Sequence, residues 1–245
     1  MTTGHGGNGA DGWSAAVHER LGLGRLLPLG EAADGVWLAE RAAATALRRS
    51  TAEVPGTALG RLRLCLADPG SADRPAVRPP PSALPPGALR IEGDFATVGG
   101  EPLPAVAERL RTALYQHAVE RLGLRVSEVD LRVTALLEKP ESDSSGTTAP
   151  VGAVAVAPRG TAAVVAANVP GVAHLSGALG APVLVTRGHV RVELATAEGH
   201  RPSEVARAVR RRVSASLPSH PTVAVLITSV DVPRGGRRSP SGDRP

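Results

Sequence analysis

The sequence of 245 residues contains a single cysteine, Cys65, and only four aromatic residues: Trp13, Trp37, Phe95 and Tyr115. One cysteine cannot build a disulfide framework or a cysteine-based metal site. Four aromatic side chains are too few for a platform on which nucleic-acid bases stack. No run of about 18 apolar residues occurs, so the sequence predicts no membrane-spanning helix.

Lysine is almost absent, because Lys139 is the only lysine among 28 basic residues. The net charge is +5, and residues 233–245 alone hold four arginines against one aspartate. The rest of the chain is therefore close to neutral, which argues against general nucleic-acid binding. The abundance of Ala, Arg, Gly, Pro and Val is typical of codon bias in a high-GC bacterial genome.

The beginning of the chain, MTTGHGGNGADG, lacks the basic segment and apolar segment of a secretory signal. A lone cysteine also suits a reducing compartment. We therefore expect a cytoplasmic protein.

Composition divides the chain into segments. Residues 1–12 are Gly-rich and predict a disordered tail. Residues 13–34 predict a short helix and a loop. Residues 35–138 predict a first α+β unit, with strands at 36–38, 62–66, 89–98 and 126–136 and helices at 40–53 and 104–122.

A proline-dense insert, residues 68–88, interrupts this first unit. Its Pro79-Pro80-Pro81 run favours polyproline II and excludes a packed helix. The insert is either a ligand for a proline-recognition domain or a stiff surface loop, and the loop is the favoured interpretation.

Residues 139–149 are polar and predict a flexible linker. A second α+β unit follows at 150–232, with strands at 154–156, 183–185, 189–194 and 222–230. Its helices are expected to be a short Ala/Val helix that ends at Asn168 and a second helix at 203–217. Residues 233–245 predict a basic disordered tail.

The second unit repeats features of the first. Val54-Pro55-Gly56 recurs as Val169-Pro170-Gly171, and VAERLRTAL at 106–114 recurs in outline as VARAVRRRV at 205–213. The predicted fold class is α+β, with two repeated strand-helix-strand-strand-helix-strand units. Their sheets are expected to be mostly antiparallel, with helices on one face. A two-domain tandem and a fused pseudo-dimer both remain open.

Three segments carry a resemblance to a known family: AERAAATALRRSTAEVPG (39–56), PLPAVAERLRTALYQHAVERLGL (102–124) and VSEVDLRVTALL (126–137). Together they resemble the alkaline shock protein family of bacterial envelope stress response proteins, with the second unit similar only in outline. The resemblance implies two degenerate tandem copies and a non-enzymatic scaffold. It also implies that the chain acts at the inner membrane surface, where it would bind a membrane-anchored protein partner.

Motifs of catalysis are missing from the sequence. Gly22-Leu23-Gly24 lacks the spacing of a dinucleotide loop. The seven histidines do not form the zinc-peptidase pattern. Cys65 lies between leucines and is interpreted as a small buried apolar residue. The sequence therefore predicts no catalytic residue, no cofactor and no metal.

The candidate contact residues are arginines on the last predicted helix and in the tail. On that helix they lie broadly opposite a stripe of Val205, Val209 and Val213, and a solvated face is the plain alternative. An anionic lipid surface or an acidic partner is the functional interpretation. The predicted set is Arg207, Arg210, Arg211, Arg234, Arg237 and Arg238.

Two other functions stay open. A small-molecule-sensing module would bind its effector between the two repeats. An enzyme whose site is assembled from distant residues is the third alternative. The oligomeric state, including a homo-oligomer, is also left open.

Overall fold

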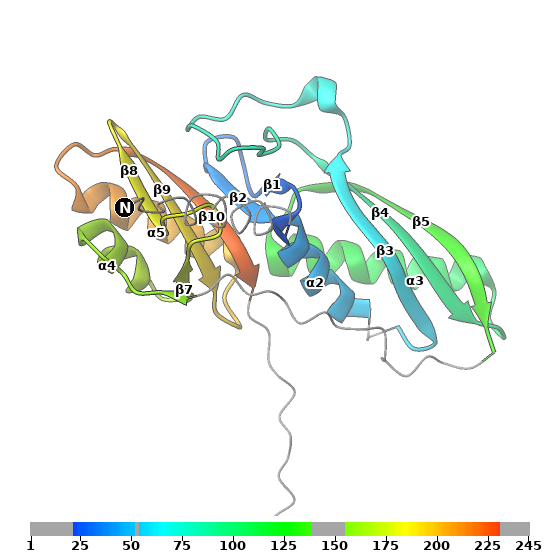
Figure 1. The fold of residues 1–245 in the computed structure, drawn as a ribbon. Helices are drawn as coiled ribbons and strands as arrows, with labels where there is room; N and C mark the ends of the chain where they lie inside the picture. The colour runs from blue at the N-terminus through cyan, green and yellow to red at the C-terminus, as the bar shows by residue number, and fades with distance from the viewer. Residues whose placement is uncertain (1–21, 52–53, 139–154, 231–245) are drawn as a thin grey trace, which may run out of the picture.

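The computed structural model describes residues 22–51, 54–138 and 155–230. This part of the chain forms a mixed α+β fold with two sheets and four α-helices (Figure 1). The predicted tails, the helix expected from residue 13, and the linker at 139–149 lie outside the described residues. None of the helices in the described ranges has the length and apolarity to span a membrane.

The larger sheet combines strands from both ends of the chain. Its order is β1-β2-β10-β9-β7-β6, and β8 also pairs with β9. The strands are β1 (Leu26–Pro28), β2 (Val36–Ala39), β6 (Ala155–Val156), β7 (Val172–Ser176), β8 (Val183–Thr186), β9 (His189–Thr196) and β10 (Thr222–Val230). β10 runs parallel to both β2 and β9, whereas the other pairs of this sheet are antiparallel.

β10 is the centre of the larger sheet because its sequence, TVAVLITSV, is apolar on both faces. Residues 223–228 are all buried, as is every residue of β2. Strands buried on both faces lack the alternation of half-exposed strands. Helices α2 (Glu40–Ser50) and α5 (Pro202–Ser216) pack against β10, and α4 (Thr161–Ala167) packs against α5 and β7.

The smaller sheet has the order β3-β4-β5, with β3 (Thr57–Leu66), β4 (Leu89–Val98) and β5 (Val126–Leu137). β3 and β4 are antiparallel. β4 and β5 are parallel and are joined through α3 (Leu103–Gln116) and a π-helical segment at His117–Leu122. β4 alternates strictly, with Leu89, Ile91 and Phe95 fully buried, so its other face lies toward solvent.

The two sheets share one continuous apolar core. The carboxylate of Glu40, the first residue of α2, also bridges them. It accepts hydrogen bonds from the backbone N–H of Arg25 at 3.2 Å and of Leu64 at 3.0 Å. Because Arg25 directly precedes β1 and Leu64 lies in β3, this carboxylate adds a polar link between the two sheets.

The predicted insert covers the larger sheet. It contains a short 3-10 turn at Pro69–Ser71, buries Val77, and donates a backbone hydrogen bond from Leu84 to Leu26 at 2.9 Å. The Leu84 carbonyl accepts a hydrogen bond from the indole of Trp37 at 3.1 Å. The segment is thus a packed cover in part, rather than only a surface loop.

Repetition of the whole predicted unit is not confirmed. β2 was expected to belong with the strands of residues 35–138, but it pairs with β10. Strands β1 and β7 were not predicted, and β3 begins at Thr57 rather than at 62. Two local features do recur. A helix joins parallel strands in each sheet, and each Val-Pro-Gly turn places its glycine at positive φ, +74° for Gly56 and +88° for Gly171.

A candidate interaction surface on the smaller sheet

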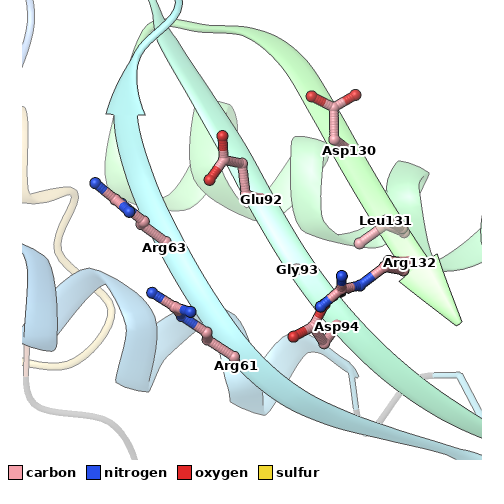
Figure 2. A pocket seen from close by; sticks show the side chains of 8 residues that line it. All are labelled: Arg61, Arg63, Glu92, Gly93, Asp94, Asp130, Leu131 and Arg132. Carbon is pink, nitrogen blue, oxygen red and sulfur yellow. Dashed lines mark hydrogen bonds and ion pairs between the residues drawn. The ribbon is translucent and has the colours of Figure 1, made fainter. Parts of the chain in front are cut away.

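The exposed face of the smaller sheet carries charged side chains in register. Arg63 pairs with Glu92 across β3 and β4, and Glu92 pairs with Asp130 across β4 and β5. These side chains line an open depression of about 370 Å³ together with Arg61, Gly93, Asp94, Leu131 and Arg132 (Figure 2). The depression lies on one sheet, and it is not the cleft between repeats in which the sequence placed an effector.

The acidic side of this face is largely neutralised. The Arg132 Nε lies 3.0 Å from Asp94 Oδ1, and Arg90 pairs with Glu128 and lies 3.5 Å from Asp130 Oδ2. The hydrogen bond to Glu128 raises the pKa of Arg90 above its ordinary value, with the nearby negative charge of Asp130 adding to the effect. The charges of β4 and β5 therefore offset one another in part, while Asp130 and Arg132 stay 62% and 77% exposed.

The β3 side of the same face is different. Arg61 and Arg63 form no ion pair with any described residue. Figure 2 shows both side chains extending past the outer edge of β3, away from Glu92 and Asp94. Both guanidinium groups therefore remain available to an external anion.

Helix α2 continues this positive charge along the edge of β3. Arg48 donates a hydrogen bond to the Gly60 carbonyl at 3.1 Å, which places its guanidinium beside Arg61. Partial burial lowers the pKa of Arg48, although it stays charged at neutral pH. Arg41 lies two helical turns earlier on the same exposed face of α2. We call Arg41, Arg48, Arg61 and Arg63 the basic seam.

The predicted arginines of α5 are used inside the fold. Arg207 donates two hydrogen bonds to Asp34, at 2.9 and 2.8 Å, and this contact raises the pKa of Arg207. Arg210 donates to the carbonyls of Ala33 at 2.8 Å and Val223 at 3.0 Å. Burial lowers the pKa of Arg210. Both side chains hold the loop before β2 against α5.

Arg211 is the one other predicted arginine that lies within the described residues. Arg211 is exposed on α5. Arg234, Arg237 and Arg238 lie outside the described residues. The structure therefore engages Arg207 and Arg210 within the fold and leaves Arg211 exposed, and a surface shared with the three tail arginines stays a prediction.

Groups suited to chemistry are sparse in the described part of the chain. Residues 22–51, 54–138 and 155–230 hold no cluster of three His, Cys, Asp or Glu side chains able to bind a metal. The thiol of Cys65 lies 3.8 Å from Glu92 Oε1, and burial together with that carboxylate raises its pKa. Burial lowers the pKa of His189, and Arg78 and Arg191 add to the effect.

The basic seam is not among the predicted contact residues, although the sequence contains a signal for it. Arg61 and Arg63 alternate with Leu62 and Leu64, so a strand would place both arginines on one face. The spacing of Arg41 and Arg48 likewise places both on one face of a helix. What the sequence does not contain is the contact between Arg48 and Gly60, which joins the two pairs.

Comparison with known proteins adds no relative. No family model, no curated protein and no solved structure matches this chain. The residues and their geometry are therefore the basis for any functional inference.

Proposed function

We propose that this chain is a non-enzymatic interaction protein that binds an acidic protein partner through the basic seam. The observation that carries the proposal is the pair Arg61 and Arg63, which point past the edge of β3 without an ion pair among the described residues. Guanidinium groups bind carboxylates in a two-pronged geometry, and neighbouring ones favour a partner with several acidic side chains.

The proposal extends the resemblance to the alkaline shock protein family. In that setting the partner is anchored in the inner membrane, and the chain is a cytoplasmic scaffold recruited to the membrane surface. Rows of arginine also attract anionic headgroups, at about 1 kcal/mol per charge near the surface. Direct lipid contact is therefore a secondary contribution, and the protein partner provides specificity.

Fractionation of cells tests the seam. The full-length chain is compared with Arg61→Glu/Arg63→Glu and with a control, Arg121→Glu/Arg212→Glu, which makes the same change in net charge at exposed helical positions. We expect the full-length chain and the control to sediment with membranes at low salt and to be released at high salt. The seam variant should remain in the supernatant at both salt concentrations.

Two results would contradict the proposal. One is membrane association of the seam variant equal to that of the control. The other is full binding of the purified chain to protein-free anionic vesicles, because the recognised surface would then be lipid rather than protein.

The sensing module is the second function, and the depression on the smaller sheet is the feature that supports it. A metabolite held there would contact Arg61, Asp94 and Arg132. A ligand that binds only the folded state raises the melting temperature. A thermal-shift screen of charged metabolites should therefore find a stabilising compound whose effect disappears in Asp94→Asn, and otherwise this second function fails.

A further inference from the structure

The two edges of the smaller sheet differ in how their backbone groups are satisfied. At the edge of β3, Glu40 accepts from the Leu64 N–H at 3.0 Å, Arg25 donates to the Leu64 carbonyl at 3.4 Å, and Arg48 donates to Gly60. Side chains occupying an edge in this way prevent another strand from pairing with it. β3 is therefore a protected edge.

The edge of β5 is protected only near its start. The Leu89 N–H of β4 donates to the Arg125 carbonyl at 2.7 Å, whereas the Val129 carbonyl accepts from Arg111 Nε at 3.1 Å on the opposite side. A register shift between Leu89 and Arg90 lies between these two positions, and the pairing of β5 with β4 is then regular from Glu128 to Val133. Along this regular stretch, backbone groups of successive residues point to opposite sides of the strand, so those of Leu131 and Val133 point away from β4, as those of Val129 do. Within the described part of the chain, no hydrogen bond reaches the outward groups of Leu131 and Val133.

We propose that β5 pairs antiparallel with β5 of a second copy of this chain, joining two three-stranded sheets into one of six strands. The two-fold axis passes through Leu131, which faces Leu131 of the second copy. In this register Asp130 faces Arg132 of the second copy, and Arg132 faces its Asp130. Opposite charges directly across a strand pair are stabilising.

Charge also excludes the neighbouring registers. An axis through Asp130 places two aspartates opposite each other, and an axis through Arg132 does the same with two arginines. An axis through Val129 places Glu128 opposite Asp130. Like charges in these positions are destabilising, so of the registers with an axis between Val129 and Arg132, the one centred on Leu131 is self-complementary.

Exposed apolar side chains flank the same edge. Tyr115 is 44% exposed and Leu136 is 63% exposed. Because Arg111 of α3 reaches the edge of β5, Tyr115, one turn later, lies on the same side of that helix. In the proposed dimer, α3 of each copy lies beneath the joined sheet, and Tyr115 becomes covered there. The Arg111 hydrogen bond to Val129 is given up when the strands pair.

Sedimentation velocity of the full-length chain tests this register with two single variants, Asp130→Arg and Arg132→Asp. Their parent side chains are 62% and 77% exposed, so folding should persist, and circular dichroism checks it. We expect a concentration-dependent dimer for the unaltered chain and at least a ~10-fold weaker dimer for each variant alone. An equimolar mixture of the two variants should dimerise again, because the two neighbouring arginines of one variant then face the two neighbouring aspartates of the other.

A monomeric unaltered chain at every concentration would overturn the proposal. So would unchanged dimers of the single variants, or a mixture that stays monomeric. The Arg61→Glu/Arg63→Glu variant is the control, because the basic seam lies along the opposite edge and its loss should leave the dimer intact. Failure of this inference is thereby separable from failure of the proposed function.

Discussion

The guanidinium of Arg207 and the carboxylate of Asp34 form a two-pronged ion pair, with hydrogen bonds of 2.9 and 2.8 Å. The pair joins α5 to the loop between β1 and β2, residues that lie far apart in the sequence. The Arg207 hydrogen bond holds the pKa of Asp34 below its ordinary value, and it outweighs the opposing effect of burial.

We predict that Asp34→Asn lowers the free energy of unfolding by about 1 kcal/mol at pH 7, a modest value because Arg207 is half exposed. A depressed pKa in the folded state stabilises above the ordinary aspartate pKa, and the stabilisation is lost as pH falls through the depressed value. The difference from the unaltered chain should therefore be constant from pH 5 to 8 and shrink below about pH 4. Urea unfolding of both proteins at each pH measures this difference in the free energy of unfolding. Asp73→Asn, at an exposed position, is the control, and a difference that persists to about pH 2 would contradict the prediction.

The two Val-Pro-Gly turns give a matched pair of substitutions. Both Gly56 and Gly171 have positive φ, so alanine at either position is strained by about 1 kcal/mol. A Cβ at Gly56 has ordinary contacts with Val98, the nearest at 3.7 Å, whereas one at Gly171 would lie 2.6 Å from Val205. We expect Gly171→Ala to lower the free energy of unfolding by about 3 kcal/mol, more than Gly56→Ala does. Equal losses of unfolding free energy for the two variants, measured by denaturant unfolding, would contradict this and would show that Val205 on α5 moves aside from the added Cβ at no cost.

Cys65 should react slowly with iodoacetamide. Burial and the carboxylate of Glu92 raise the thiol pKa, so the thiolate is scarce at pH 8. Because the chain has one cysteine, the alkylation rate reports this thiol alone. We expect the pH–rate profile to have its midpoint above the usual thiol range and to move down in Glu92→Gln. Glu198→Gln, remote from β3, should leave the profile unchanged, and a midpoint unaffected by Glu92→Gln would contradict this electrostatic contribution.

The insert should shield Trp37. The Trp37 indole donates to the Leu84 carbonyl and is almost fully buried. In a Trp13→Phe background, replacing residues 70–86 with a short Gly-Ser segment should shift the Trp37 emission to longer wavelength and lower the melting temperature. Pro79→Ser, at an exposed position of the insert, should change neither. Unchanged emission after removal of residues 70–86 would mean that another part of the chain covers the indole.

Local patterns predicted much of the secondary structure. The stripe of Val205, Val209 and Val213 is buried on α5, and the alternation of residues 89–98 forms β4. The strand at 36–38 was also predicted and forms β2, whereas β1 was not predicted, because Leu-Leu-Pro contains no alternation from which a strand could be recognised. Nothing in the local sequence indicates that β2 pairs with β10 rather than with a nearer strand.

The candidate interaction surfaces likewise depend on contacts between residues that lie far apart in the sequence. The positions of Arg207 and Arg210 on α5 follow from helical spacing, but their partners, Asp34 and the Ala33 carbonyl, come from the far end of the chain. Arginines that a helix pattern assigns to solvent are thus occupied. Conversely, the alternation of Arg61 and Arg63 is visible in the sequence, but only tertiary contacts show that β3 is an edge strand.

The pairing of β2 with β10 has a consequence for how the protein is made. β2 leaves the ribosome early and β10 late, and the larger sheet cannot close until both are present. A nascent chain therefore carries Trp37 and its apolar neighbours without their strand partner for most of synthesis. Closure of the larger sheet therefore has to wait for β10, and we expect chaperone binding to be concentrated on the earlier segment. The two parts on either side of residues 139–149, produced separately, should each aggregate and should regain solubility when co-expressed.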